Sequence, residues 1–137
     1  MEKVFLLEIV TPHGLVVSAS VREAYIPGSR GDFGVLPGHF HFLTSLRRGA
    51  MHYLLDDKMR FLALGEGFAE VTPTRTTILT DKAEPAEEID TEKAGADKSL
   101  AEEQLKTVAR EDPSYKKIVE NLERANLRIR VAQKAIR

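Results

Sequence analysis

The composition of this 137-residue chain changes abruptly near Pro85, and this break constrains the fold more than any other feature. Eight of the nine glycines and all six phenylalanines precede Pro85, whereas Ala, Glu, Lys, Leu and Arg dominate after it. Apolar runs between glycine-rich turns favour strands, and the second mixture favours helices. The break therefore predicts an α+β chain with a β domain at residues 1–84 and a helical domain at residues 85–137.

Short apolar runs recur between turn signals throughout the first domain. They occupy residues 4–10, 15–17, 21–26, 33–36, 40–46, 51–55, 59–64, 68–71 and 76–79. Gly, Pro and Asp separate the runs, and Asp56-Asp57-Lys58 has the composition of a hairpin turn. Short strands at intervals of about 8–12 residues are typical of a sandwich or barrel. We therefore expect an N-terminal antiparallel β-sandwich.

The second domain predicts an antiparallel hairpin of two helices, at about residues 90–110 and 113–136. Asp90 has the side chain of a helix N-cap, so the first helix should begin directly after it. Asp112-Pro113 predicts the second start, with Asp as the cap and Pro at the first helical position. Apolar residues then recur at spacings of four and three in a heptad-like seam. The seam consists of Ile118, Leu122, Ala125, Ile129, Ala132 and Ile136.

Charge divides the two helices of this hairpin. Residues 85–112 have a net charge of −5, and residues 113–137 have a net charge of +5. One interpretation is a pair of complementary helices, in which each exposed ion pair contributes well under about 1 kcal/mol. The other is a basic helix that can leave its partner for a different acidic surface. Because the apolar seam contains much alanine, the hairpin is marginal alone and needs packing from elsewhere.

The chain as a whole offers little for catalysis or nucleic-acid binding. Its 20 basic and 21 acidic residues give a net charge of −1, so we expect no nucleic-acid partner. It has no cysteine, which excludes disulfides and thiolate chemistry. His39 and His41 would point to one face of a strand, as in the first metal motif of cupins, but no carboxylate follows as a third ligand. We expect neither a metal nor a catalytic site.

The run GSRGDFGVLPGH at residues 28–39 resembles the Gly-x-x-Gly-x-x-Gly-x-x-Pro-Gly-His signature of ε subunits of F-type rotary ATP synthases. Leu43-Thr44 then follows as in that family, whereas residues 40–42 depart from its pattern. GFAEV at residues 67–71 and Ile89-Asp90 also resemble family segments. The similar segments stand in the family's order along the chain.

This resemblance implies a non-catalytic rotor subunit at the cytoplasmic face of the bacterial plasma membrane, peripheral to the membrane. Its sandwich would attach to the γ subunit and to the ring of c subunits, and would transmit torque to the catalytic α/β hexamer. We expect the contact region near the signature, although core packing explains its phenylalanines equally well. The expected contact residues are Gly28, Gly31, Phe33, Gly34, Pro37, Gly38, His39, Phe40, His41 and Phe42.

In many bacterial relatives the hairpin is regulatory, and it either lies compact or extends into the hexamer and blocks ATP hydrolysis. The resemblance implies that basic residues of the second helix then meet an acidic loop of the catalytic subunits. These residues are Lys116, Lys117, Arg124 and Arg128. The alternatives to this function are a freestanding β-sandwich interaction module and a cupin-like metalloprotein.

Some relatives bind regulatory ATP in the compact state, and the corresponding motif is present here with one change. The matching residues are Glu84, Ile89, Asp90, Ala94, Arg124 and Arg128, with Lys93 in place of arginine. Lysine lacks the planar fork of arginine, so we expect weak ATP binding. Asp90 is also explained as a helix cap, and the two arginines as a basic helix face.

Overall fold

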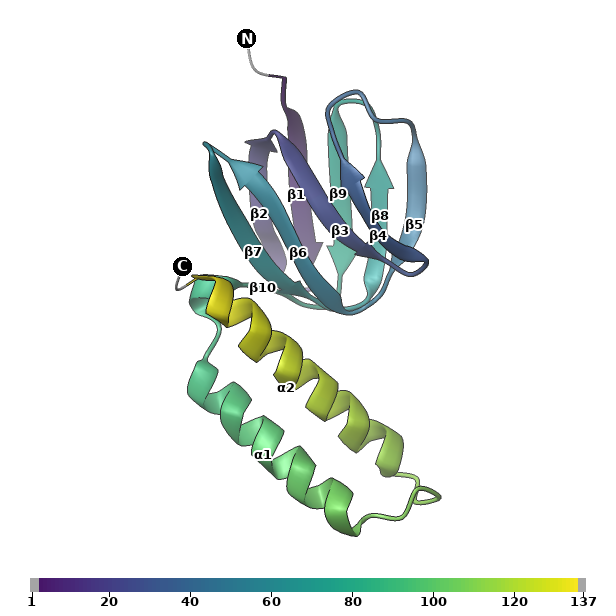
Figure 1. Ribbon diagram of the computed structural model, residues 1–137. Coiled ribbons are helices and arrows are strands. Elements are labelled where there is room, and N and C mark those ends of the chain that lie inside the picture. The colour runs from purple at the N-terminus through teal and green to yellow at the C-terminus, as the bar shows by residue number, and fades with distance from the viewer. Residues whose placement is uncertain (1–2, 136–137) are drawn as a thin grey trace. The chain divides into compact units, whose positions relative to one another are not determined.

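The computed structural model describes residues 3–135 and divides into two compact units, Met1–Pro85 and Ala86–Arg137 (Figure 1). The described part of the first unit contains ten strands in one hydrogen-bonded sheet. The strands are β1 (Phe5–Thr11), β2 (Gly14–Val21), β3 (Glu23–Gly28), β4 (Gly31–Val35), β5 (Phe42–Leu46), β6 (Gly49–Leu55), β7 (Lys58–Leu64), β8 (Gly67–Val71), β9 (Arg75–Thr80) and β10 (Ala83–Pro85).

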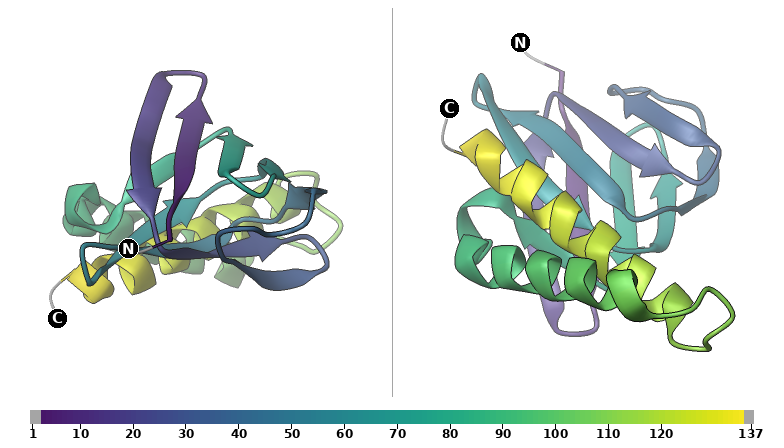
Figure 2. Two further views of the ribbon diagram at one scale, coloured as in Figure 1. Left: turned by 90° about the horizontal axis from the view of Figure 1, so that it is seen from above. Right: turned by 60° about the horizontal axis from the view of Figure 1, so that its bottom comes forward.

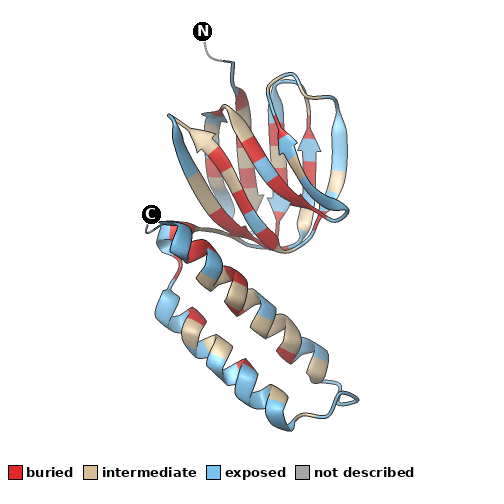
Figure 3. Ribbon diagram, in the orientation of Figure 1, coloured by how far each residue is buried: buried red, intermediate tan, exposed pale blue. Residues whose placement is uncertain are grey.

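The sheet folds around one apolar core, which confirms the predicted β-sandwich. Its strand order is β10-β7-β6-β3-β5-β8-β9-β1-β2, and β4 pairs with β3 off this path. Buried and exposed positions alternate along the strands (Figure 3), as expected where one face of a sheet covers a core. In β1, for example, Phe5, Leu7 and Ile9 are buried while Leu6 and Glu8 on the opposite face are partly exposed.

One strand pair departs from the antiparallel expectation. β1 and β9 run parallel, with Leu6 opposite Arg75 and Val10 opposite Leu79. All other pairs among the described strands are antiparallel. The sequence signal failed here because β1 and β9 come from opposite ends of the unit, so no tight turn fixes their relative direction.

The predicted hairpin turn between β6 and β7 is confirmed. Asp56 and Asp57 form its two-residue loop, and Leu55 pairs with Lys58 on either side. Both aspartates have positive φ, 50° and 60°, as the two central residues of a type I′ turn require. Aspartate tolerates this left-handed conformation better than most residues.

The described part of the second unit contains a 3₁₀ turn η1 (Ala86–Glu88) and two helices, α1 (Thr91–Thr107) and α2 (Tyr115–Ala135). Asp90 caps α1, because its Oδ1 accepts a hydrogen bond from the Lys93 backbone N–H at 3.0 Å. This confirms the predicted cap. α1 ends at Thr107 instead of residue 110, where Val108 takes an extended conformation.

The second helix begins two residues later than predicted. Asp112 Oδ1 accepts hydrogen bonds from the backbone N–H of Ser114 at 2.8 Å and from its hydroxyl at 2.7 Å. Both bonds lower the pKa of Asp112, and the backbone bond has the larger effect. Asp112 and Pro113 therefore belong to a turn that precedes α2. Ile136, the last residue of the predicted seam, lies outside the described residues.

The helices of the second unit lie side by side in Figure 1 and in the right-hand view of Figure 2. The buried residues of α1 are two alanines, Ala94 and Ala101. α2 buries both large and small residues, which are Ile118, Ala125, Leu127, Val131 and Ala132. No helix within residues 3–135 has the length and apolar content needed to cross a membrane.

Candidate docking surface and interhelical pocket

The loop between β4 and β5 contains the Pro-Gly-His end of the glycine signature. The backbone N–H of His39 donates to the Leu36 carbonyl at 3.2 Å, which closes a four-residue turn. Gly38 has a φ of 83°, as the third residue of a type II turn requires, and proline precedes it at the second position. The Gly38 N–H also donates to the Pro73 carbonyl at 2.8 Å, so the loop is tied to the turn between β8 and β9.

This loop corrects the expectation of a strand from residue 40. β5 begins at Phe42, so His39 and His41 lie in the loop and do not share a strand face. His39 Nδ1 lies 2.8 Å from the Phe40 carbonyl oxygen. Residues 3–135 contain no group of three or more His, Asp or Glu placed to hold a metal ion. The geometry that motivated the cupin comparison is therefore missing.

The three phenylalanines of the expected contact region have different surroundings. Phe33 is partly buried against the core, and its ring meets Phe42 edge to face with centroids 5.2 Å apart. Phe42 is 41% exposed, whereas Phe40 in the loop is 87% exposed. Core packing thus explains Phe33, while Phe40 is available to a partner.

The glycines of the signature also differ. Gly28 is buried, and a Cβ there would lie 2.7 Å from the Gly31 carbonyl oxygen, so this glycine is required by the β3–β4 hairpin. Gly34 lies within β4 and not at a turn, where a Cβ would meet the Tyr25 ring at 3.1 Å. A groove of about 580 Å³ lies beside β4 and β5. Its lining residues are Arg30, Gly31, Asp32, Phe33, Phe42, Leu43, Thr44 and Ser45.

An exposed apolar stripe crosses the outer face of four strands, and the sequence analysis missed it. Phe68 of β8 pairs with Leu79 of β9, Leu79 with Val10 of β1, and Val10 with Leu15 of β2. Phe68, Leu79 and Leu15 are each more than half exposed. Large apolar side chains in one contiguous exposed row mark an interaction surface more often than chance exposure does.

Strand alternation could have identified this stripe. In β9 the buried Thr76, Ile78 and Thr80 alternate with exposed positions, which places Leu79 outward. In β8 the buried Ala69 and Val71 place Phe68 outward in the same way. The sequence therefore predicts apolar residues at outward positions of these strands, and the strand order shows that the strands are neighbours.

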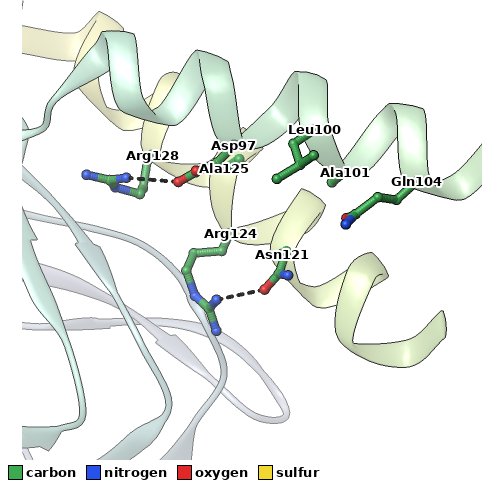
Figure 4. A pocket seen from close by; sticks show the side chains of 8 residues that line it. All are labelled: Asp97, Leu100, Ala101, Gln104, Asn121, Arg124, Ala125 and Arg128. Carbon is green, nitrogen blue, oxygen red and sulfur yellow. Dashed lines mark hydrogen bonds and ion pairs between the residues drawn. The ribbon is translucent and has the colours of Figure 1, made fainter. Parts of the chain in front are cut away.

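A second candidate site lies between α1 and α2 (Figure 4). It is a pocket of about 210 Å³. Its lining residues are Asp97, Leu100, Ala101, Gln104, Asn121, Arg124, Ala125 and Arg128. The charged and amide side chains come from both helices, so the pocket depends on the helices being paired.

Asp97 connects cations of both helices. Lys93 Nζ lies 3.0 Å from Asp97 Oδ1, and Arg128 Nη1 lies 4.0 Å from Asp97 Oδ2. Arg124 Nη1 donates a hydrogen bond to Asn121 Oδ1 at 3.3 Å. Figure 4 shows Arg128 directed to Asp97 and Arg124 directed to Asn121.

The second unit by itself contains only part of the expected ATP motif. Lys93 and Arg128 both contact Asp97, Asp90 is engaged as the helix cap, and Ala94 is buried in α1. Glu84 belongs to the first unit, where it lies in β10 opposite Ala63 of β7. Asp97 and Asn121 were missed, although the i, i+4 spacing of Lys93 and Asp97 was a signal for an ion pair.

The predicted inhibitory residues fall into two groups. Lys116 and Lys117 are exposed in the first turn of α2. Arg124 and Arg128 are partly buried and line the interhelical pocket. The first pair is therefore exposed to solvent, and the second pair belongs to the surface between the two helices.

Comparisons with known proteins place both units in one family. The family described as "ATP synthase, Delta/Epsilon chain, beta-sandwich domain" matches residues 4–86. The family described as "ATP synthase, Delta/Epsilon chain, long alpha-helix domain" matches residues 87–133. Together these matches cover nearly the whole chain.

Curated relatives and solved structures agree with the family matches. The chain is 45% identical to the ATP synthase epsilon chain of Geotalea uraniireducens over 131 residues, which cover 96% of this chain and 95% of the relative. Identity is 42% to the epsilon chain of Geobacter sulfurreducens, over 96% of this chain and 95% of that one.

The fold is similar to that of a chain in the OSCP/F1/c-ring structure of the mitochondrial ATP synthase of Euglena gracilis. The TM-score is 0.70 at 20% identity, with 97% of this chain and 81% of that chain covered. A chain of the Tetrahymena thermophila central stalk and c-ring structure gives a TM-score of 0.55 at 10% identity, with 96% and 95% covered. Given the full-length identity to curated epsilon chains and the two family matches, this chain belongs to the epsilon chain family of ATP synthases.

Proposed function

We propose that this chain is a non-catalytic central-stalk subunit that couples rotation of the c-ring to the catalytic α/β hexamer. The sandwich binds the γ subunit and the c-ring, and the chain works at the cytoplasmic face of the bacterial plasma membrane without crossing it. The observation that carries this proposal is the exposed apolar stripe on a well-packed sandwich in a chain of the epsilon family. A rotor subunit needs such a rigid body with a permanent docking face, because it has to transmit torque.

The stripe and the loop between β4 and β5 offer two separate contacts. The stripe lies on the outer face of β8, β9, β1 and β2, and we assign it to the γ subunit. The loop displays Phe40, and the hydrogen bond between Gly38 and Pro73 restrains it. We assign this loop and the neighbouring groove to the c-ring.

We further propose that the helical hairpin inhibits ATP hydrolysis when it opens. The buried residues of α1 are alanines, so α1 itself contributes little apolar surface that would resist separation of the helices. Lys116 and Lys117 are exposed at the start of α2, where they can meet an acidic surface of the catalytic subunits. Two arrangements separated by a few kcal/mol suffice for such a switch, provided that a partner or ligand binds only one of them.

Regulatory ATP would favour the closed hairpin. Lys93, Arg124 and Arg128 lie at or beside a pocket formed by both helices, and their donors suit phosphate oxygens. ATP bound there would stabilise the closed arrangement by its binding free energy and would oppose inhibition. The pocket of about 210 Å³ is smaller than typical ligand sites of about 300–1,000 Å³, which supports weak binding.

The decisive experiment removes residues 113–137 and measures ATP hydrolysis by the assembled complex. We expect faster hydrolysis with unchanged assembly. Charge reversal of Lys116 and Lys117 should act in the same direction, while reversal of Lys106 on α1 serves as the matched control. Unchanged hydrolysis in the truncated complex would contradict an inhibitory hairpin.

Docking is tested separately by pull-down with purified γ subunit. Replacement of Phe68 and Leu79 by serine should weaken retention of γ. Leu100→Ser is the control, since Leu100 is as exposed as Phe68 but lies on α1. If the unsubstituted chain retains neither γ nor the c-ring, the result would instead support the alternative that it is a freestanding interaction module.

A further inference from the structure

Asp97 is an acidic residue in a pocket that otherwise offers cations and amides. Of the residues that line the pocket, Arg124 and Arg128 are the positive ones and Asp97 is the negative one. We propose that Asp97 is the internal counter-ion of this pocket and sets its affinity for phosphate-bearing ligands, because it occupies the cations that a phosphate group would otherwise take. The inference rests on the nucleotide part of the proposed function.

The geometry gives Asp97 the position of a competing anion. Its two carboxylate oxygens face different cations, with Oδ1 at 3.0 Å from Lys93 Nζ and Oδ2 at 4.0 Å from Arg128 Nη1. A phosphate group uses the same charge-assisted hydrogen bonds from the same donors. The carboxylate and a phosphate group therefore compete for the same hydrogen-bond donors of Lys93 and Arg128.

Partial burial of Arg128 distinguishes this pair from two fully exposed surface charges. The Arg128 side chain is 18% exposed and that of Asp97 is 39% exposed, so water screens the pair only in part. The pair also crosses from α1 to α2, which means that Asp97 links the helices in the ligand-free chain. A phosphate group that binds Arg128 would replace the ion pair between Asp97 and Arg128 by its own ion pair with Arg128.

The chemical class of the ligand follows from size and charge. The pocket holds about 210 Å³, which accommodates phosphate groups more readily than a complete nucleoside triphosphate. Affinity should therefore depend chiefly on the polyphosphate part of the ligand. Asp97→Asn keeps the size of the side chain and removes the negative charge, so it raises the net positive charge offered to that part.

Isothermal titration calorimetry on the full chain tests the inference with ATP, tripolyphosphate and adenosine as probes. We expect Asp97→Asn to bind ATP and tripolyphosphate about tenfold more tightly than the native chain, with adenosine unaffected. Added salt should reduce the gain. In the double variant with Arg128→Ala the gain should disappear, because the effect passes through that cation.

The control is Glu103→Gln, which removes a carboxylate on the same helix that pairs with Lys106 at 3.1 Å outside the pocket. An equal gain in this control would show a general charge effect and overturn the inference. Asp97→Ala is the second variant and should change affinity in the same direction. Circular dichroism verifies that each variant keeps its helices.

The remaining outcomes separate this inference from the proposed function. Equal, measurable affinity in the native chain and Asp97→Asn would overturn the role of Asp97 and leave the nucleotide site standing. Absence of binding in both would overturn the role of Asp97 together with the nucleotide site. Hydrolysis by the complex that lacks residues 113–137 tests the inhibitory hairpin independently of either result.

Discussion

The sandwich and the hairpin are stabilised in different ways. The sandwich core contains large side chains with under 2% exposure, including Leu7, Met51 and Ile78. The buried residues of α1 are alanines. Burial of a Leu, Ile or Met side chain contributes about 1.5–3 kcal/mol, and alanine contributes far less. The sandwich core therefore buries larger apolar side chains than α1 does.

Several polar side-chain contacts organise the helices and the turn of the hairpin. Asp90 caps α1, Asp112 organises the turn before α2, and Asp97 links the helices through Arg128. Such contacts are exchangeable, because a ligand or partner can offer the same groups. Apolar core contacts have no such substitute in water, and this difference supports the proposal that the hairpin is the regulated unit.

The largest expected effect comes from matched truncations in the two units. Ile78→Ala should cost the sandwich about 2–5 kcal/mol, because it leaves a cavity in a close-packed core. Ile118→Ala in α2 should cost less, because Ile118 is 8% exposed and Ile78 is fully buried, and it should leave the sandwich unaffected. Native-state hydrogen exchange measures the opening free energy of each unit separately. The difference between the units would be contradicted if both substitutions lowered the free energy of unfolding equally and both units opened in a single transition.

Glycine substitutions within the sandwich give the next largest effect. Gly28→Ala should destabilise by about 1–3 kcal/mol, because its Cβ would meet the backbone oxygen of Gly31. Gly34→Ala should stay within about 0.5 kcal/mol, because its neighbour is the Tyr25 ring, which is partly exposed and can move. Urea denaturation compares the two. A large loss at Gly34 would show that the Tyr25 ring is fixed in place.

The sequence was sufficient to predict the nine main strands and both helices, because each has a strong local pattern. β10 was missed, since its three residues contain no alternation and include a proline. Its pairing with β7 depends on the tertiary fold. The same reason explains the loop at residues 36–41, where the bond from Gly38 to Pro73 joins segments 35 residues apart.

The candidate sites were less predictable than the fold. The signature predicted Phe40 as a contact residue. Phe68 and Leu79 can be recognised as parts of one exposed apolar surface only when the order of strands is known. Asp97 could be paired with Lys93 from spacing, whereas its contact with Arg128 depends on the relative rotation of α1 and α2. Local propensity does not determine that rotation.

A smaller effect is expected at residue 93. Lys93→Arg should tighten ATP binding by about 1 kcal/mol, since a guanidinium can offer phosphate a bidentate fork. The gain should be larger in the Asp97→Asn background, because Asp97 also attracts the residue at position 93. Calorimetry on the four combinations measures this coupling. Additive effects would show that Asp97 and a phosphate do not compete for residue 93.

The smallest effect concerns the pH dependence of the hairpin. The Ser114 backbone and hydroxyl bonds lower the pKa of Asp112 below its usual 3.8, so its carboxylate contributes stability that is fully present above this value. The contribution is lost as the pH falls from 3.8 through the lowered value. Asp112→Asn should therefore reduce the acid-induced loss of helical circular dichroism between about pH 5 and about pH 2. Glu111→Gln, which leaves the bonds to Ser114 intact, should retain the native profile. If Asp112→Asn also retains that profile, the turn before α2 does not contribute to the acid sensitivity of the hairpin.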